Sequence, residues 1–261
     1  MICHSVSKLV VLCTTLFLTT PSLASILLML EGTGGAGKST LSKMLARHMP
    51  EACIIAEPFE RWNSNHWSRV SDDPALGNAF TTFLHDKKRW ALTFQNYVFL
   101  THYQALEDAY KDHPDKALYI SDRSHFSGIF TYARMFLENG YLNPMEWAMF
   151  QENAWWLVEH LPYKPDGFIY LRTQPTTACK RANKRNRAVN ESLNLPYYET
   201  LHRYHEEWLL EKKNVPQAIA HIPVLVLDGE LDFEGDPAIQ EAFVQQIKEF
   251  AHAMRHSLIL Q

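Results

Sequence analysis

Residues 26–40 read Ile-Leu-Leu-Met-Leu-Glu-Gly-Thr-Gly-Gly-Ala-Gly-Lys-Ser-Thr. An apolar run passes directly into the pattern Gly-x-x-x-x-Gly-Lys-Ser, which begins at Gly32 and ends at Ser39. Glycines let the chain wrap tightly, so that successive backbone N–H groups point at phosphate oxygens. The pattern needs a strand before it and a helix after it, and the sequence supplies both. The stretch therefore predicts a nucleotide-binding loop rather than an ordinary glycine turn.

The side chains of this loop indicate what it holds. Lys38 can neutralise the terminal phosphates of ATP, and the Ser39 hydroxyl can ligate Mg²⁺. The helix that follows directs the positive end of its dipole at the same anion. We therefore expect ATP and Mg²⁺ as cofactors, with ATP bound by Gly32, Thr33, Gly34, Gly35, Ala36, Gly37, Lys38, Ser39 and Thr40.

Composition narrows the class of protein. The chain has 261 residues, of which 46% are hydrophobic, enough for one large α/β domain or two small ones. Its formal net charge of −4 gives no broad positive field for nucleic acid or an acidic membrane. The four cysteines have no metal-ligand spacing. His202 and His205 lie three residues apart without a suitably spaced third ligand, so we interpret them as structural.

Residues 1–24 have two interpretations that the sequence leaves open. Lys8 precedes a short apolar stretch, and small residues end at Ala24, as in a cleaved secretory signal. A mis-assigned start or an unprocessed leader would look the same. The apolar stretch is short for a membrane span, so no stable membrane association is expected. Because the chemistry depends on ATP, we predict a cytoplasmic protein, with a secreted or periplasmic one as the alternative.

Short apolar runs alternate with helix-like patterns along the rest of the chain. Unbroken apolar strands of this kind are typical of a parallel sheet covered by helices on both faces. We therefore expect an α/β fold of the P-loop NTPase type, with strands near residues 26–31, 52–56, 117–121, 167–171 and 224–227. One helix is expected over residues 76–111. Others are expected to begin at Asn143-Pro144 and at about Pro237.

Charged side chains follow two of the predicted strands, where ligands bind in such folds. Glu57 precedes a proline and suits a general base that takes a proton from an attacking hydroxyl. Asp122 can help to hold Mg²⁺, and Arg123 can stabilise charge on a transferring phosphoryl group. A surface glutamate and a structural ion pair are the alternatives for these positions.

A basic cluster predicts an arginine-rich lid. Arg181, Lys184, Arg185 and Arg187 fall close together and are followed by a turn. Lids supply arginines to the phosphates and exclude water during phosphoryl transfer. The cluster is local on an acidic chain, so it does not predict nucleic-acid binding.

Gln95 lies in an aromatic stretch of the predicted helix at residues 76–111. Its amide can read a base edge with a paired donor and acceptor, and neighbouring aromatic rings can stack on a base. This signal is weak from the sequence alone.

Together these motifs resemble the deoxynucleoside kinase family, which includes the animal deoxycytidine, deoxyguanosine and mitochondrial thymidine kinases. The resemblance runs from about Ile26 to the C-terminus, so residues 25–261 are expected to form one kinase domain. It is carried, in family order, by Glu31-Gly32 to Thr40, Glu57-Pro58 to Trp62, Trp90 to Tyr97, Asp122-Arg123-Ser124, Glu146-Trp147, Tyr170 to Arg172, Arg181 to Arg187, Tyr197 to Leu209 and Leu227 to Phe233.

The resemblance implies phosphoryl transfer from ATP to the 5′-hydroxyl of a small-molecule deoxynucleoside, in a homodimer. It makes Glu57 the general base. It implies that Arg123 binds the 5′ end of the nucleoside and stabilises the transition state, and that Lys38 contacts the donor phosphates. It assigns Arg181, Arg185 and Arg187 to the lid, and Asp232 and Phe233 to the donor adenine. The implied substrate-binding set is Glu57, Trp62, Phe94, Gln95, Arg123, Gly128, Tyr132 and Glu191, and the implied metal set is Ser39 and Asp122.

Departures from the family pattern concern the base and the sugar. An arginine and an aspartate that sharpen base choice in the deoxycytidine and deoxyguanosine branches fall at His102 and Gly128. Their loss predicts a wider pocket that favours thymidine or pyrimidines generally. Leu84 stands where the family has a tyrosine on the sugar 3′-hydroxyl, and only Glu191 is left of the paired glutamates after the lid.

Two other functions compete with this hypothesis. A nucleoside monophosphate kinase of the thymidylate type would need extra arginines for the acceptor phosphate, whereas Glu57-Pro58 and Gln95 fit a neutral nucleoside better. An exported nucleotide-binding protein without activity is suggested only by residues 1–24, and the complete catalytic set argues against it.

Overall fold

A single parallel sheet forms the centre of the protein. The computed structural model describes residues 25–65, 76–160, 162–184 and 194–259. In that part of the chain the sheet has the order β2-β3-β1-β4-β5, with every neighbouring pair parallel. Its strands are β1 (Ile26–Glu31), β2 (Cys53–Ile55), β3 (Leu118–Asp122), β4 (Gly167–Arg172) and β5 (Val224–Asp228). The predicted α/β fold is confirmed, and each predicted strand ends within about one residue of its expected position.

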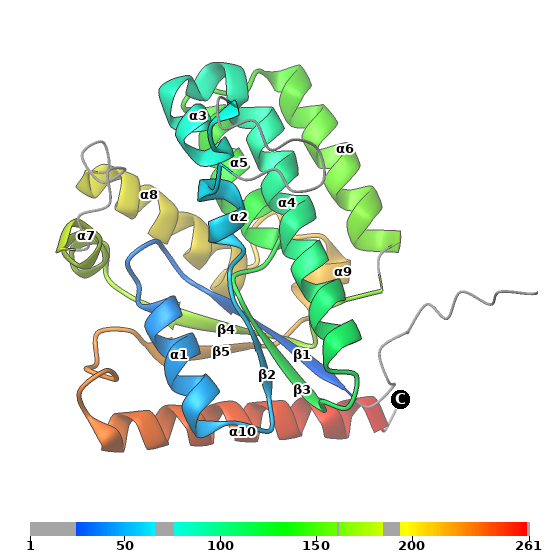
Figure 1. Ribbon diagram of the computed structural model, residues 1–261, viewed down its shortest axis with the longest axis vertical. Coiled ribbons are helices and arrows are strands. Elements are labelled where there is room, and N and C mark those ends of the chain that lie inside the picture. The colour runs from blue at the N-terminus through cyan, green and yellow to red at the C-terminus, as the bar shows by residue number, and fades with distance from the viewer. Residues whose placement is uncertain (1–24, 66–75, 161, 185–193, 260–261) are drawn as a thin grey trace, which may run out of the picture.

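Helices cover both faces of this sheet (Figure 1). The central strand β1 alternates between them, as the pleat requires. Ile26, Leu28 and Leu30 pack with α1 (Lys38–His48) and α10 (Pro237–Ile259). Leu27 and Met29 belong to the other cluster, which includes α4 (Lys87–Asp112) and α6 (Pro144–His160). Each residue of β1 is buried, which explains the unbroken apolar run from Ile26 to Leu30.

The remaining helical elements are short. They are α2 (Phe59–Asn63), α3 (Ala79–His85), a π-helical turn η2 (Gly128–Tyr132), α5 (Ala133–Glu138), α7 (Pro175–Lys184), α8 (Leu195–His205), a second π-helical turn η4 (Glu206–Leu210) and α9 (Gln217–Ala220).

Local capping explains where the helices begin. Helix α6 starts at Pro144 as predicted, because Asn143 and Glu146 each accept the other's backbone N–H at 2.9 Å. The expectation of one helix over residues 76–111 is wrong at Asp86. There the backbone leaves the helical region, and the Asp86 carboxylate caps α4 by accepting from the Arg89 N–H at 3.0 Å. The break sets α3 at an angle to α4 (Figure 1).

The first described residue, Ser25, lies at the amino end of β1. That edge of the sheet is opposite the carboxyl ends of the strands, and the last turn of α10 lies near it (Figure 1). Residues 1–24 lie outside the described part of the chain, so the domain boundary at residue 25 stays a prediction. Among the described helices, none combines the length and the apolar composition that a membrane crossing requires.

Candidate active site

The phosphate loop connects β1 to α1 at the carboxyl edge of the sheet. Its glycines are required by their geometry: Gly35 has φ of +81°, and a Cβ there would lie 2.2 Å from the Ala178 carbonyl oxygen. Lys38 is buried, and its ammonium donates to the carbonyls of Gly32 at 2.8 Å and Thr33 at 3.1 Å. Burial, reinforced by the nearby Arg123 charge, lowers the pKa of Lys38 to about 8. The loop therefore encloses a cation that is poised to contact phosphate.

Asp122 ends β3, directly beside the end of β1. Its buried carboxylate accepts a hydrogen bond from the Ser39 side chain, and its Oδ1 atom has no partner among the described residues. Burial raises the pKa of this carboxyl group. Mg²⁺ prefers oxygen ligands of these two types. The pair brought together here therefore fits a Mg²⁺ ion beside the phosphate loop.

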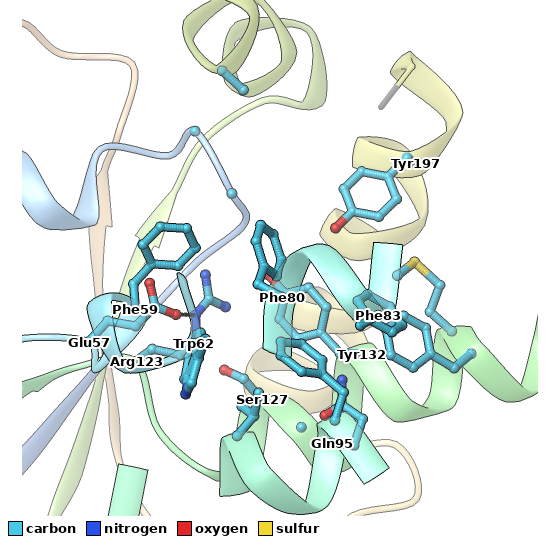
Figure 2. A pocket seen from close by; sticks show the side chains of 18 of the residues that line it. Glu57, Phe59, Trp62, Phe80, Phe83, Gln95, Arg123, Ser127, Tyr132 and Tyr197 are labelled. Atoms are coloured by element: carbon cyan, nitrogen blue, oxygen red, sulfur yellow. Dashed lines mark hydrogen bonds and ion pairs between the residues drawn. The ribbon is translucent and has the colours of Figure 1, made fainter. Parts of the chain in front are cut away.

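Glu57 and Arg123 form an ion pair across the carboxyl ends of β2 and β3. The Arg123 Nε donates to Glu57 Oε1 at 2.7 Å, and the two side chains lie beside the phosphate loop (Figure 2). Burial opposes ionisation of Glu57, but the charges of Arg123 and Lys38 outweigh it and hold the pKa of this carboxyl group below its usual range. Glu57 is thus a carboxylate at neutral pH. The Nη1 atom of Arg123 has no partner among the described residues and stays available to a ligand.

One cavity of about 600 Å³ joins this ion pair and the phosphate loop to an aromatic chamber. Trp62, Phe94 and Tyr132, which the sequence assigns to a substrate, line it. Phe80 and Phe83 from α3 line it too (Figure 2), and the Phe83 ring stacks on Phe94 with centroids 4.7 Å apart. The sequence pattern does not indicate these two rings, because it predicts one continuous helix over residues 76–111. The break at residue 86 places α3 over the cavity.

Gln95 lines the cavity on the side away from Glu57 (Figure 2). It is 3% exposed, and its Oε1 atom has no partner in the described chain. A Cβ added at Gly128 would lie 3.3 Å from that oxygen, so the glycine leaves space next to the amide. Leu84 also lines the cavity. An amide with a free acceptor at the end of an aromatic chamber can pair with the edge of a planar ring.

His102 lines the same chamber and is neutral. Burial lowers its pKa to about 4. Its Nδ1 atom lies 2.9 Å from the Val98 carbonyl oxygen, which requires the proton on Nδ1 and leaves Nε2 as an acceptor. No described residue pairs with Nε2. At this position the chamber therefore offers uncharged hydrogen-bonding groups, the Gln95 amide and the neutral His102 ring.

The predicted donor residues lie on the other side of the phosphate loop. Arg181 donates to the carbonyls of Ala36 at 3.2 Å and Gly229 at 2.7 Å, which ties α7 to the loop and to the segment after β5. The ring of Phe233 is 4% exposed and packs beneath Gly37, where a Cβ would lie 2.8 Å from it. Asp232 follows β5 and accepts from the Gly235 N–H at 3.0 Å. The predicted lid residues Arg185 and Arg187, and Glu191, lie outside the described residues.

Glu31 is a site residue whose role the sequence did not reveal. It is the last residue of β1 and is fully buried. Its carboxylate accepts from the Ser124 N–H at 3.0 Å and from the hydroxyls of Ser124 and Ser127. An acidic residue at the end of an apolar strand is a signal that could have drawn attention to it, but its partners are more than 90 positions away.

Comparison with known proteins places the chain among relatives of one family. The model of the family described as deoxynucleoside kinase matches residues 28–252. Deoxycytidine kinase 2 of Gallus gallus is 35% identical, over 85% of this chain and 88% of its own length. Probable deoxycytidine kinase FPV151 of Fowlpox virus is 32% identical, over 85% and 86%. The mitochondrial deoxyguanosine kinase of Xenopus laevis is 30% identical, over 85% and 88%.

Proposed function

Since the chain belongs to the deoxynucleoside kinase family, we propose that it transfers the γ-phosphoryl group of ATP to the 5′-hydroxyl of a pyrimidine deoxynucleoside, with thymidine preferred. The kinase activity follows from the family. The choice of ATP, of the base and of the individual catalytic residues is our proposal. The observation that carries it is the Glu57–Arg123 pair, held in one cavity with the phosphate loop at one end and the Gln95 amide at the other.

In the proposed reaction Glu57 is the general base. The nucleoside 5′-oxygen attacks the γ-phosphorus while its proton passes to the Glu57 carboxylate, and ADP leaves with the bridging oxygen. Its depressed pKa keeps this carboxylate ionised and ready to accept the proton. Arg123 pairs with Glu57 through its Nε atom. Its unpaired Nη1 atom would donate to the oxygens of the transferring phosphoryl group.

Lys38 and the loop N–H groups would hold the β- and γ-phosphates of the donor. Ser39 and Asp122 would hold Mg²⁺, which neutralises charge that develops between these phosphates. Arg181 already binds the carbonyls of Ala36 and Gly229 next to the loop. From there, together with Arg185 and Arg187, it would close the donor site. Asp232 and Phe233 are proposed to border the donor adenine.

The preference for pyrimidines rests on the far end of the cavity. The Gln95 amide can accept from the N3–H of thymine and donate to its O4. Gly128 supplies no carboxylate that could accept a hydrogen bond from the exocyclic amino group of a base. The neutral His102 adds no charge to the chamber. The relatives carry the names deoxycytidine and deoxyguanosine kinase, so the preference for thymidine is a specific and testable departure.

A coupled assay of ADP release with the four deoxynucleosides and with thymidine monophosphate tests this proposal. We expect thymidine to give the highest kcat/KM, deoxycytidine to follow, purines to be weaker and the monophosphate to be inert. Preference for the monophosphate would establish the thymidylate kinase alternative. Preference for a purine nucleoside would contradict our account of the base site while leaving phosphoryl transfer intact.

We also propose a homodimer that forms through α4 and α6. Large apolar side chains on these helices are exposed: Leu100 at 47%, Met149 at 52% and Trp156 at 57%. A hollow between the helices is lined by Leu100, Trp156 and their neighbours. Exposed apolar groups of this kind mark association surfaces. Light scattering of the full chain and of Trp156→Glu tests this, since the variant should be monomeric.

The need for ATP supports the cytoplasm as the site of the reaction.

A further inference from the structure

The buried carboxylate of Glu31 has no place in the chemistry described so far. It is not among the residues that line the cavity, yet it is fully buried at the end of the central strand. A buried carboxylate is unfavourable unless specific groups compensate for its lost hydration. Burial accordingly raises the pKa of Glu31, against the opposing effects of Arg123 and two serine hydroxyls. The compensating groups show what this residue holds in place.

Among the described residues, the hydrogen-bond partners of Glu31 belong to the turn after β3. Oε1 accepts from the backbone N–H and the hydroxyl of Ser124, and Oε2 accepts from the hydroxyl of Ser127. The Ser124 hydroxyl accepts in turn from the Phe126 N–H at 3.1 Å, which fixes it as a donor toward Glu31. One carboxylate therefore fastens two serines of this turn to the strand that leads into the phosphate loop.

The residue immediately before Ser124 is Arg123, and its backbone is unusual. Arg123 has φ of +70°, in the left-handed region that side-chain-bearing residues rarely adopt. Such a conformation persists only where the surroundings enforce it. The Arg123 N–H donates to the Leu30 carbonyl at 2.9 Å, and the Ser121 hydroxyl donates to the Arg123 carbonyl at 2.9 Å. Glu31 supplies the restraint on the following side, through Ser124.

The conformation of this turn decides where the guanidinium lies. In it Arg123 reaches Glu57 at 2.7 Å and lies 5.1 Å from the centre of the Tyr132 ring. Ser127 immediately precedes η2, the turn that carries Gly128 and Tyr132. Glu31 thus connects the strand of the phosphate loop to the arginine and to the helix beside the base (Figure 2 shows Arg123, Ser127 and Tyr132).

We propose that Glu31 is a positioning residue that holds the strained Arg123 turn, and thereby aims the guanidinium at Glu57 and the transferring phosphoryl group. The inference rests on the role proposed above for Arg123. Through Arg123, Glu31 acts on the transition state more than on nucleoside binding. Its removal should therefore lower kcat far more than it changes either KM.

The test compares Glu31→Ala with Glu31→Gln in the full chain. Displacing a catalytic group by about 1 Å costs about 10²-fold in rate, so Glu31→Ala should lose at least about that much in kcat while both KM values stay within about threefold. Glutamine has the same shape: its amide oxygen can accept from Ser124 and its amide nitrogen can donate to Ser127. Glu31→Gln should therefore recover kcat to within about tenfold of wild type.

Asp166→Ala is the matched control for simple loss of stability. Asp166 accepts from the Leu27 N–H at 2.7 Å, so it is a half-buried carboxylate at the opposite end of the same strand, away from the cavity. This variant should lower the unfolding temperature but keep kcat. Equal losses of kcat in Asp166→Ala and Glu31→Ala would overturn the proposal.

A double-variant cycle with Arg123→Lys identifies the path of the effect. Lysine keeps the charge but lacks the guanidinium that Glu31 positions. The kcat loss in the double variant should be clearly smaller than the product of the two single losses, and a fully multiplicative loss would contradict the proposal. If Glu31→Ala does not fold, Ser124→Ala with Ser127→Ala removes both hydroxyl donors to Glu31, together with the acceptor of the Phe126 N–H, and unchanged kcat there would equally overturn it.

The outcomes also separate this inference from the proposed function. An inactive wild-type chain with every deoxynucleoside would refute the function itself. An active wild type together with a folded Glu31→Ala variant whose kcat is within about threefold of it would refute only the role of Glu31. The same holds if Glu31→Gln is as impaired as Glu31→Ala, since charge rather than geometry would then be responsible.

Discussion

Replacement of Gln95 by alanine tests how the cavity recognises a base. Gln95 is buried on α4, and its Oε1 atom has no partner among the described residues. With thymine in the chamber, the amide would accept from N3–H and donate to O4. The substitution removes both contacts and leaves the neighbouring rings and the Glu57–Arg123 pair in place.

The size of the effect follows from the two groups left unpaired. A buried polar group without its partner costs about 1–3 kcal/mol, so two cost about 2–6 kcal/mol, or roughly 30-fold to 10⁴-fold in kcat/KM. The cavity of about 600 Å³ is large enough to admit water at the vacated position. A bridging water would recover part of the loss, so we expect about 30-fold to 10³-fold for thymidine.

Steady-state kinetics with thymidine, at saturating ATP, measures this loss. The KM for ATP should stay unchanged, because the phosphate loop lies at the other end of the cavity. Gln104→Ala is the matched control: this residue is on the same helix, but its amide oxygen accepts from Arg61 at an exposed position. A Gln95→Ala variant that keeps thymidine kcat/KM within about threefold of the control would refute the proposed base contact.

Other predictions concern the donor site, the leader and pH. Lys38→Ala should reduce kcat by at least about 10³-fold, and activity within about tenfold of wild type would exclude the loop as the donor site. A chain that starts at Ser25 should keep full kcat, because the amino end of β1 lies opposite the site, and loss of activity in a folded truncated chain would contradict this. A wild-type protein found cleaved after Ala24 and exported would contradict the predicted cytoplasmic location. The kcat/KM for ATP should fall above pH about 8, where the pKa of Lys38 lies and the ammonium loses its charge, and Lys38→Arg should lack this limb in a pH–rate profile. At low pH, activity should be lost as Glu57 takes up a proton. Because the pKa of Glu57 is lowered, the acid limb of the pH–rate profile should lie below the ordinary pKa of a glutamate side chain.

Much of this site could be predicted from the sequence because parallel strands end at one edge. Glu57 and Arg123 follow two strands that are neighbours in the sheet, so the topology brings them close enough for the ion pair to form. The phosphate loop was identifiable because its glycines and lysine are contiguous. Ser39 and Asp122 meet for the same reason, since β1 and β3 pair directly.

The remaining features depend on individual contacts that the hydrophobic pattern does not encode. The break at Asp86 is one aspartate inside a long helical pattern, yet it brings Phe80 and Phe83 over the cavity. The protonated nitrogen of His102 is decided by the carbonyl one turn away, which composition does not reveal. Glu31 meets its serines only once β1 and β3 are paired. Individual hydrogen bonds, both local and long-range, rather than periodicity, define these parts of the site.

The most direct test of the account is the rate of phosphoryl transfer to thymidine by Glu57→Gln. Glutamine can still accept from the Arg123 Nε, so the ion-pair geometry and nucleoside binding should persist while the base is lost. We predict an unchanged dissociation constant for thymidine and a kcat lower by roughly 10²–10⁴-fold. Near-normal turnover by this variant would remove Glu57 from the mechanism and contradict the account.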